Sequence, residues 1–284
     1  MAPVEGDGST VGIPRMGEAR RCDVRHCGRM GSDCATRTFW WDAGRPAGAA
    51  ANDLGAVVFD LDGALADIER DGQRVAFNAA FAAHGLDIEW SVAEYGRLVC
   101  ITDEGRRVAS ALRRRGYGRI SAEIAAHVSR TKSDLFEASV LGGDVTPRAG
   151  LEDLVNSLYF AQIPVAVISR GARSWVEPLV RQLLGDGIAD TVVTPDDMTR
   201  PGPEPDLHGQ VLSELGLAPE SVLAVAGTAV GFRAARAAKL ATMVVTTGYS
   251  RGADYAGAAD VRTGFDGLLS ADCQWLHRRW QMGR

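Results

Sequence analysis

Apolar and polar positions form two kinds of segment along the chain from residue 54 onward. Short, continuous apolar runs predict buried strands, and they cover 56–60, 165–168, 191–194, 222–226 and 241–246. Between the later runs, apolar residues recur at the spacing of helices, over 149–160, 172–184, 206–215 and 229–238. Because strands alternate with helices, the pattern predicts parallel βαβ units and an α/β fold with a doubly wound sheet.

One helical block interrupts this alternation after the first strand. Helical spacing is found over 72–84, 91–99, 103–115 and 121–140. We therefore expect a core built from 54–67 and 147–270, with a helical cap at 68–146 inserted between the two parts.

The two ends of the chain differ from this core. Residues 1–53 are rich in Gly, Arg and polar residues without an apolar period, which favours a disordered extension. Cysteines and a histidine gather there and suggest zinc, but their spacing fits no structural zinc site well; they are Cys22, His26, Cys27 and Cys34. Residues 271–284 form a basic, amphipathic tail, for which we expect a helix that packs on the core. Either end could instead contact a protein partner.

Composition narrows the function classes. The 284 residues suffice for a core, a cap and a tail, and 46% are hydrophobic. A formal net charge of -5 argues against a nucleic-acid partner. No apolar run reaches membrane-spanning length, and the N-terminus lacks a secretory apolar segment. The expected core and cap contain one cysteine, Cys100, and the tail contains one more, Cys273. So few cysteines form no disulfide framework, which favours a reducing cytoplasm.

The first strand ends in the candidate chemistry. Asp60 and Asp62 lie two residues apart, so an extended chain places them on the same side. Paired carboxylates at the open end of a buried strand suit a hard cation and a covalent phosphoryl intermediate. The alternative is an acidic turn after a strand.

The wider context of these aspartates resembles a known family. The strand, Asp60, Asp62, Gly63 and the following Leu65 resemble motif I of the haloacid dehalogenase (HAD) superfamily. Residues 66–78 resemble the start of the cap in CbbY-type proteins, the xylulose-1,5-bisphosphate phosphatases. The resemblance covers residues 54–270 and implies a HAD-like, Rossmannoid core with an α-helical cap.

The resemblance implies roles for the residues of motif I. Asp60 corresponds to the nucleophile and Asp62 to the general acid/base, and both correspond to magnesium ligands. Gly63 would let the backbone turn beneath a phosphate. The expected ligand is a small phosphorylated sugar.

Further residues correspond to phosphate-binding positions. Ser169 ends the strand 165–168 as the motif II hydroxyl residue does, although a helix N-cap is the alternative. Arg170 follows it and could add positive potential at the mouth of the site, or be a surface charge. Glu69 matches a substrate-loop position of the cap, and Arg200 matches an arginine that precedes the motif III lysine. Arg106 could meet phosphate, although a solvated helix start is the favoured alternative.

Two motifs depart from the family pattern. Gly202 stands where the motif III lysine belongs, and Ala226 and Gly227 replace the two acids of motif IV. Magnesium needs several oxygen ligands. We therefore expect an incomplete metal site at Asp60 and Asp62, weak Mg²⁺ binding, and weak or absent activity.

Three functions follow as hypotheses. The first is a catalytically impaired CbbY-like phosphatase homologue, a pseudoenzyme that binds a phosphosugar or regulates a partner. The second is an active, Mg²⁺-dependent sugar-phosphate phosphatase with Asp60 as nucleophile. The third is a non-catalytic interaction subunit. Metal-dependent turnover separates the second from the other two, and phosphosugar binding separates the first from the third.

Overall fold

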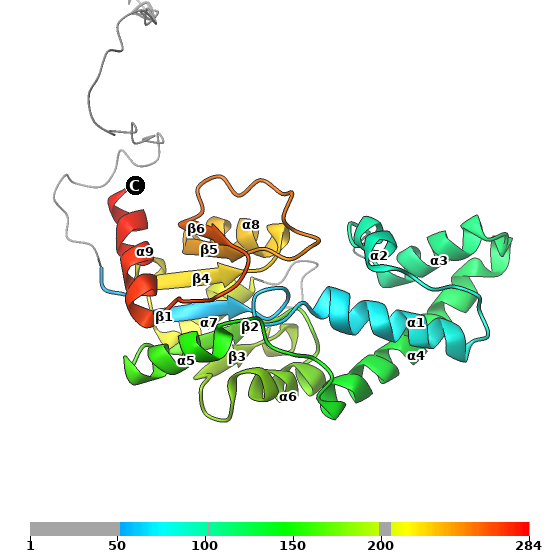
Figure 1. Cartoon of the computed structure of the whole chain (residues 1–284), viewed down its shortest axis with the longest axis horizontal. Coiled ribbons are helices and arrows are strands. Elements are labelled where there is room, and N and C mark those ends of the chain that lie inside the picture. The colour runs from blue at the N-terminus through cyan, green and yellow to red at the C-terminus, as the bar shows by residue number, and fades with distance from the viewer. Residues whose placement is uncertain (1–51, 102, 199–205, 284) are drawn as a thin grey trace, which may run out of the picture. The chain divides into compact units, whose positions relative to one another are not determined.

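A six-stranded sheet forms the middle layer of the core (Figure 1). The computed structural model describes residues 52–101, 103–198 and 206–283. The strands are β1 (Ala56–Asp60), β2 (Val165–Ile168), β3 (Thr191–Val193), β4 (Val222–Ala226), β5 (Ala241–Val245) and β6 (Asp260–Arg262). Their spatial order is β3-β2-β1-β4-β5-β6, and neighbouring strands all run parallel. This confirms the predicted α/β fold with a doubly wound sheet.

Helices cover both faces of the sheet, because successive strand residues point to opposite sides. Val57 and Phe59 of β1 belong to one apolar cluster, and Ala56 and Val58 belong to another. The first cluster includes residues of α5 (Leu151–Phe160), α6 (Arg173–Leu184) and α9 (Ser270–Met282). The second includes residues of α7 (Leu207–Leu215) and α8 (Ala229–Ala237).

The strand register aligns the carboxyl ends of the three central strands. Asp60 at the end of β1 pairs with Ile168 at the end of β2, and Phe59 pairs with Val225 of β4. From β1 the chain adds β2 and β3 on one side and then crosses to β4 on the other side of β1. This edge therefore lies at the switch point where doubly wound sheets bind ligands.

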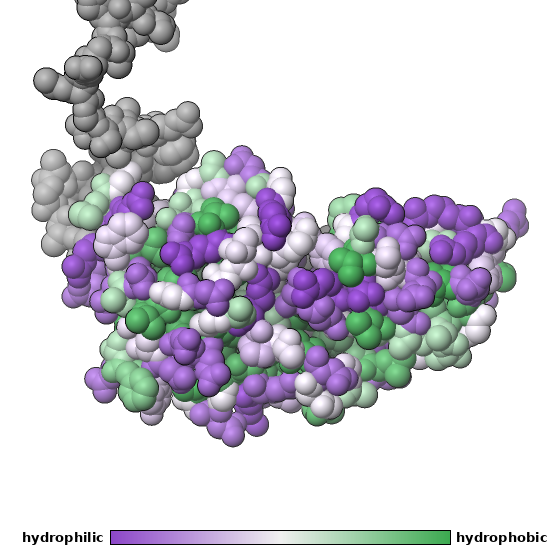
Figure 2. All heavy atoms as spheres, in the orientation of Figure 1, coloured by the Kyte–Doolittle hydropathy of each residue, from purple (hydrophilic) through white to green (hydrophobic). Residues whose placement is uncertain are grey.

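Four helices between β1 and β2 form a cap with an apolar cluster of its own. They are α1 (Arg74–Ala83), α2 (Val92–Leu98), α3 (Glu104–Arg114) and α4 (Ser121–Gly142). The Phe77 ring lies 5.1 Å from that of Trp90, and the Asn78 side chain bonds both the N–H and the carbonyl of Trp90. The outer surface of α3 is hydrophilic (Figure 2), because its last turn exposes Arg113 and Arg114.

The entry to the cap differs from the predicted helix at 72–84. A π-helical turn spans Glu69–Gln73, and α1 continues directly from it. Gly72 is buried there, where an added Cβ would lie 2.7 Å from the Phe136 ring. Wide turns of this kind are frequent at functional sites.

The C-terminal helix α9 packs on the core. Cys273 and Leu276 are buried in the main apolar cluster. The Gln281 amide donates to the carbonyl of Glu220 at 2.7 Å, and its Oε1 accepts from the N–H of Asn52 at 2.8 Å. Residues 1–51, on which the expected disorder and the zinc hypothesis fall, lie outside the described residues. Within the described ranges, no helix combines the length and the apolar character needed to cross a bilayer.

Candidate active site

The loop after β1 holds the two aspartates in a tight turn. The N–H of Leu61 donates to the carbonyl of Ile168 at 2.9 Å, and that of Gly63 donates to Ala66 at 2.8 Å. Gly63 has a φ of 77°, and an added Cβ would lie 3.0 Å from the carbonyl oxygen of Gly227. Both the left-handed backbone and this close approach require glycine.

Both aspartates titrate near neutral pH. Burial, followed by the charge of Asp62, raises the pKa of Asp60 to about 7, while Arg170 opposes the shift. Burial, followed by the charge of Glu69, raises the pKa of Asp62 to about 7, while Arg170 and Lys132 oppose it. Each carboxyl group therefore holds its proton to a much higher pH than an exposed aspartate does.

The carboxylate of Asp60 lies against the first turn of α8. A Cβ on Gly231 would overlap Oδ2 of Asp60. Thr228 caps this helix, and its hydroxyl oxygen accepts from the N–H of Gly231 at 3.0 Å. The glycine at 231 therefore makes room for the candidate nucleophile.

Ser169 and Arg170 follow β2 at the same edge of the sheet. Ser169 is buried, and its hydroxyl oxygen accepts from the N–H of Gly171 at 3.1 Å. The N-cap residue of α6 is Ala172, and no side chain caps this helix. The alternative prediction, that Ser169 is the N-cap of the helix, is therefore wrong. The Arg170 side chain is exposed.

The surroundings of the end of β4 are unfavourable for the two motif IV acids. Ala226 packs in an apolar cluster with Phe232, Val244 and Tyr255. A Cβ on Gly227 would overlap the backbone of Gly63 and Ala64. The loop after β1 therefore occupies the space that an acidic side chain at 227 would need.

Glu69 joins a buried hydrogen-bonded group in the cap. The Tyr95 hydroxyl donates to Oε2 of Glu69 at 2.5 Å, and Nη1 of Arg107 donates to the Tyr95 oxygen at 2.6 Å. The guanidinium of Arg107 also donates twice to the carbonyl of Ile101. The negative charge of Glu69 also raises the pKa of Asp62.

Lys132 is a buried cation that the sequence analysis missed. Its Nζ lies 2.7 Å from Oε1 of Glu104 and 4.8 Å from the centre of the Phe77 ring. Its position on α4 could have revealed it, because Val128, Lys132 and Phe136 recur every four residues on one helix face. A lysine within such an apolar row indicates a buried partner.

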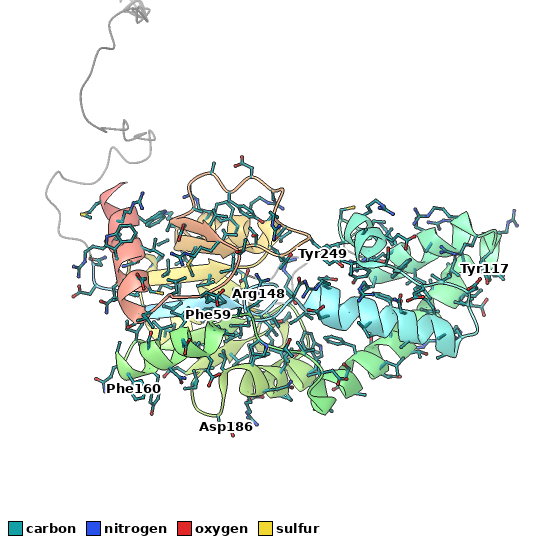
Figure 3. The ribbon with its side chains drawn as sticks, viewed as in Figure 1. Phe59, Tyr117, Arg148, Phe160, Asp186 and Tyr249 are labelled. Carbon is teal, nitrogen blue, oxygen red and sulfur yellow. The ribbon has the colours of Figure 1, made fainter. Side chains whose placement is uncertain are left out.

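Two loop residues beside the site carry no sequence signal. Arg148 donates to the carbonyls of Gly63 at 3.3 Å, Thr246 at 2.9 Å and Thr263 at 2.6 Å (Figure 3). It therefore ties the motif I loop to the segment after β5. The Tyr249 ring lies 6.0 Å from that of Tyr95 in the cap, and its hydroxyl is buried without a hydrogen-bond partner among the described residues.

The remaining predicted site residues are Arg106 and Arg200. Arg106 lies exposed in the first turn of α3, where its N–H donates to Asp103 at 2.6 Å. Arg200 and Gly202 lie outside the described residues. His208, near Arg170, has its pKa lowered to about 4 by burial and so remains neutral at pH 7.

The donor set does not fit the magnesium site that the resemblance implies. At this edge, the carboxylates of the expected ligand set are those of Asp60 and Asp62, since Ala226 and Gly227 offer no side-chain oxygen. Across the part of the chain that the structure describes, no group of three or more His, Cys, Asp or Glu residues is placed to hold a metal ion. Magnesium prefers near-octahedral oxygen coordination, which two carboxylates alone do not supply.

Comparison with known proteins identifies the family. The model of the haloacid dehalogenase-like hydrolases matches residues 54–239. The chain belongs to this family. Within the HAD family it is a homologue of CbbY proteins: it is 34% identical over 206 residues to Protein CbbY of Cereibacter sphaeroides, covering 72% of this chain and 89% of that protein. It is 32% identical over 214 residues to Protein CbbY of Rhodobacter capsulatus, covering 74% and 92%.

Solved structures of CbbY have the same fold as this HAD-family chain. The crystal structure of CbbY from Rhodobacter sphaeroides in complex with phosphate matches with a TM-score of 0.62 and 31% identity, over 77% of this chain and 98% of that one. A mutant of the same CbbY in complex with xylulose-1,5-bisphosphate matches equally well. The similarity therefore spans both the sheet and the cap.

Proposed function

We propose that this HAD-family protein binds a small phosphorylated sugar beside Asp60, Asp62 and Ser169, and that its phosphatase activity is weak or absent. The CbbY structures that hold phosphate and xylulose-1,5-bisphosphate support the ligand class. One observation supports the proposed loss of activity. The backbone of Gly63 lies so close to Gly227 that it occupies the space which the side chain of a motif IV acid would need.

The proposed roles follow the positions of the side chains. Asp60 would attack phosphorus to form an aspartyl phosphate, and Asp62 would protonate the leaving sugar oxygen and then activate water. The Ser169 hydroxyl and the backbone turn at Gly63 would hold phosphoryl oxygens. Glu69 would face the sugar from the cap.

Magnitudes indicate which defect matters. A pKa raised to about 7 lowers the ionised fraction of Asp60 at pH 7, and this costs no more than about tenfold in rate. Removing one preorganised charge-stabilising group typically costs about 10²–10³ in rate, and phosphoryl transfer depends almost wholly on positioning and charge. The missing acids therefore dominate, and protonation of Asp60 is a minor contribution.

A panel of sugar phosphates that includes xylulose-1,5-bisphosphate tests this proposal. Binding is measured by calorimetry and phosphate release by a coupled assay, each with and without Mg²⁺, on the full chain and on Asp60→Asn. We expect binding of at least one sugar phosphate with turnover no higher than that of Asp60→Asn.

Two results would contradict the proposal. Mg²⁺-dependent turnover that Asp60→Asn abolishes would establish an active phosphatase, which the intact aspartate pair favours. Absence of binding to every phosphate tested would instead favour an interaction subunit.

A further inference from the structure

The two aspartates need a nearby positive charge if a phosphate is to bind beside them. Asp60 and Asp62 share one edge of the sheet, and a phosphate dianion would be repelled by both when they are ionised. The sequence has Gly202 in place of the motif III lysine, and Ala226 and Gly227 in place of metal-binding acids. Another cation of this chain would therefore have to supply the positive charge that the phosphate needs.

Most cations around the site are already committed to protein groups. Lys132 pairs with Glu104, and Arg107 donates to Tyr95 and to the carbonyl of Ile101. The three carbonyl acceptors of Arg148 hold its guanidinium within the loop framework. If these side chains turned to a ligand, they would lose these hydrogen bonds and ion pairs, each of which contributes to stability.

Arg173, which also follows β2, is committed too. Its guanidinium forms an ion pair with Asp197 and donates to the carbonyl of Val192 at 2.9 Å. Arg173 therefore fastens α6 to the segment after β3.

Arg170 differs from all of these. It lies two residues beyond Ile168, which is the register partner of Asp60, and directly after Ser169. Among the described residues its guanidinium makes no hydrogen bond or ion pair, yet its charge acts on both aspartates. An arginine fork that is not held by protein acceptors suits bidentate binding of a phosphate.

We propose that Arg170 takes over the charge role of the missing lysine and metal site, so that a phosphate group binds here without a divalent metal ion. This inference rests on the proposed function, because it specifies how the same site holds its phosphate. Arg170 would clamp two phosphoryl oxygens from the side of β2, opposite the turn at Gly63.

Calorimetric titration of the full chain with inorganic phosphate tests the inference. It is done in EDTA and again with excess Mg²⁺, for the wild type, Arg170→Gln and Arg170→Lys. The control is Arg181→Gln, which removes an arginine on the exposed surface of α6 that pairs only with Glu177. Because Arg170 is also exposed, its replacement should leave the fold intact, which circular dichroism checks.

We expect phosphate affinity within twofold in EDTA and in Mg²⁺, a loss of tenfold or more in Arg170→Gln, a smaller loss in Arg170→Lys, and no change in Arg181→Gln. Binding that requires Mg²⁺, or that Arg170→Gln leaves unchanged, would overturn the inference while the proposed function stands. Absence of binding of both inorganic phosphate and the sugar phosphates would overturn both.

Discussion

At the scale of single residues, Asp60 shows how a reactive position costs stability. Its carboxyl group has an ordinary pKa of 3.8, which burial raises to about 7 in the folded protein. Between these two values the unfolded chain has released a proton that the folded chain retains. Stability therefore falls as the pH rises from about 4 to about 7, and stays at the lower level above that.

Asp60→Asn should remove this cost, because the amide is neutral at every pH. In EDTA at pH 8 we expect the variant to be more stable than the wild type by at most about 4 kcal/mol, since one pKa unit corresponds to about 1.4 kcal/mol. The gain should shrink through pH 6 and vanish below pH 4. Urea unfolding at each pH measures it, and a gain that is independent of pH would refute the ionisation as its cause.

The sequence pointed to the candidate reactive residues but not to the space around them. The spacing of Asp60 and Asp62 and the strand pattern sufficed to place both at one sheet edge with Ser169. From sequence alone, returning acids at 226 and 227 looks like a simple repair. The structure shows that a side chain at 227 meets backbone and that one at 226 enters an apolar cluster. Backbone proximity between distant segments leaves no trace in a hydrophobic pattern.

At the scale of elements, the strands β1, β2 and β4 begin and end where their apolar runs do. Strand β6 was not predicted, because its residues, Asp260–Arg262, are a short and largely exposed edge segment without an apolar run. The π-helical turn at Glu69–Gln73 was also missed, since one widened turn barely alters helical spacing. The structure of such short elements depends on the packing of neighbouring segments more than on their own hydrophobic pattern.

Helix α5 ends at a strained residue that offers a test of local backbone cost. Gln162 follows the C-cap of α5 with a φ of 54°, and its side chain is exposed. Glycine adopts this conformation without strain, whereas other residues pay about 1 kcal/mol. Gln162→Gly should therefore raise the stability by about 0.5–1 kcal/mol, measured by thermal unfolding. Gln162→Ala is the matched control, and an equal gain there would contradict the explanation.

At the scale of the whole molecule, α9 closes one side of the core and reaches the start of β4. Its exposed face carries Trp275 and its buried face carries Leu276. Substitutions at these two neighbouring residues can therefore distinguish the effect of the exposed face from that of the face packed on the core. The sequence predicted an amphipathic helix that packs on the core, but which core residues its apolar face meets could not be predicted from that segment alone.

Leu276→Ala should lower the free energy of unfolding by about 2–4 kcal/mol, because it empties a buried site. Trp275→Ala is the control, since that side chain is 57% exposed, and its cost should stay below about 1 kcal/mol. Denaturant unfolding of both variants measures the difference. Equal costs would show that α9 is held less firmly than its burial indicates.

The contact between Gly63 and Gly227 also bears on how such a protein can evolve. Once two backbone segments have closed on each other, a later acid at 227 arrives in occupied space and must displace the loop that carries both aspartates. Such a change disturbs the remaining catalytic residues before it can help them. An acid at 227 is therefore hard to gain by one substitution, and descendants of this chain are steered toward functions that use the site as it now stands.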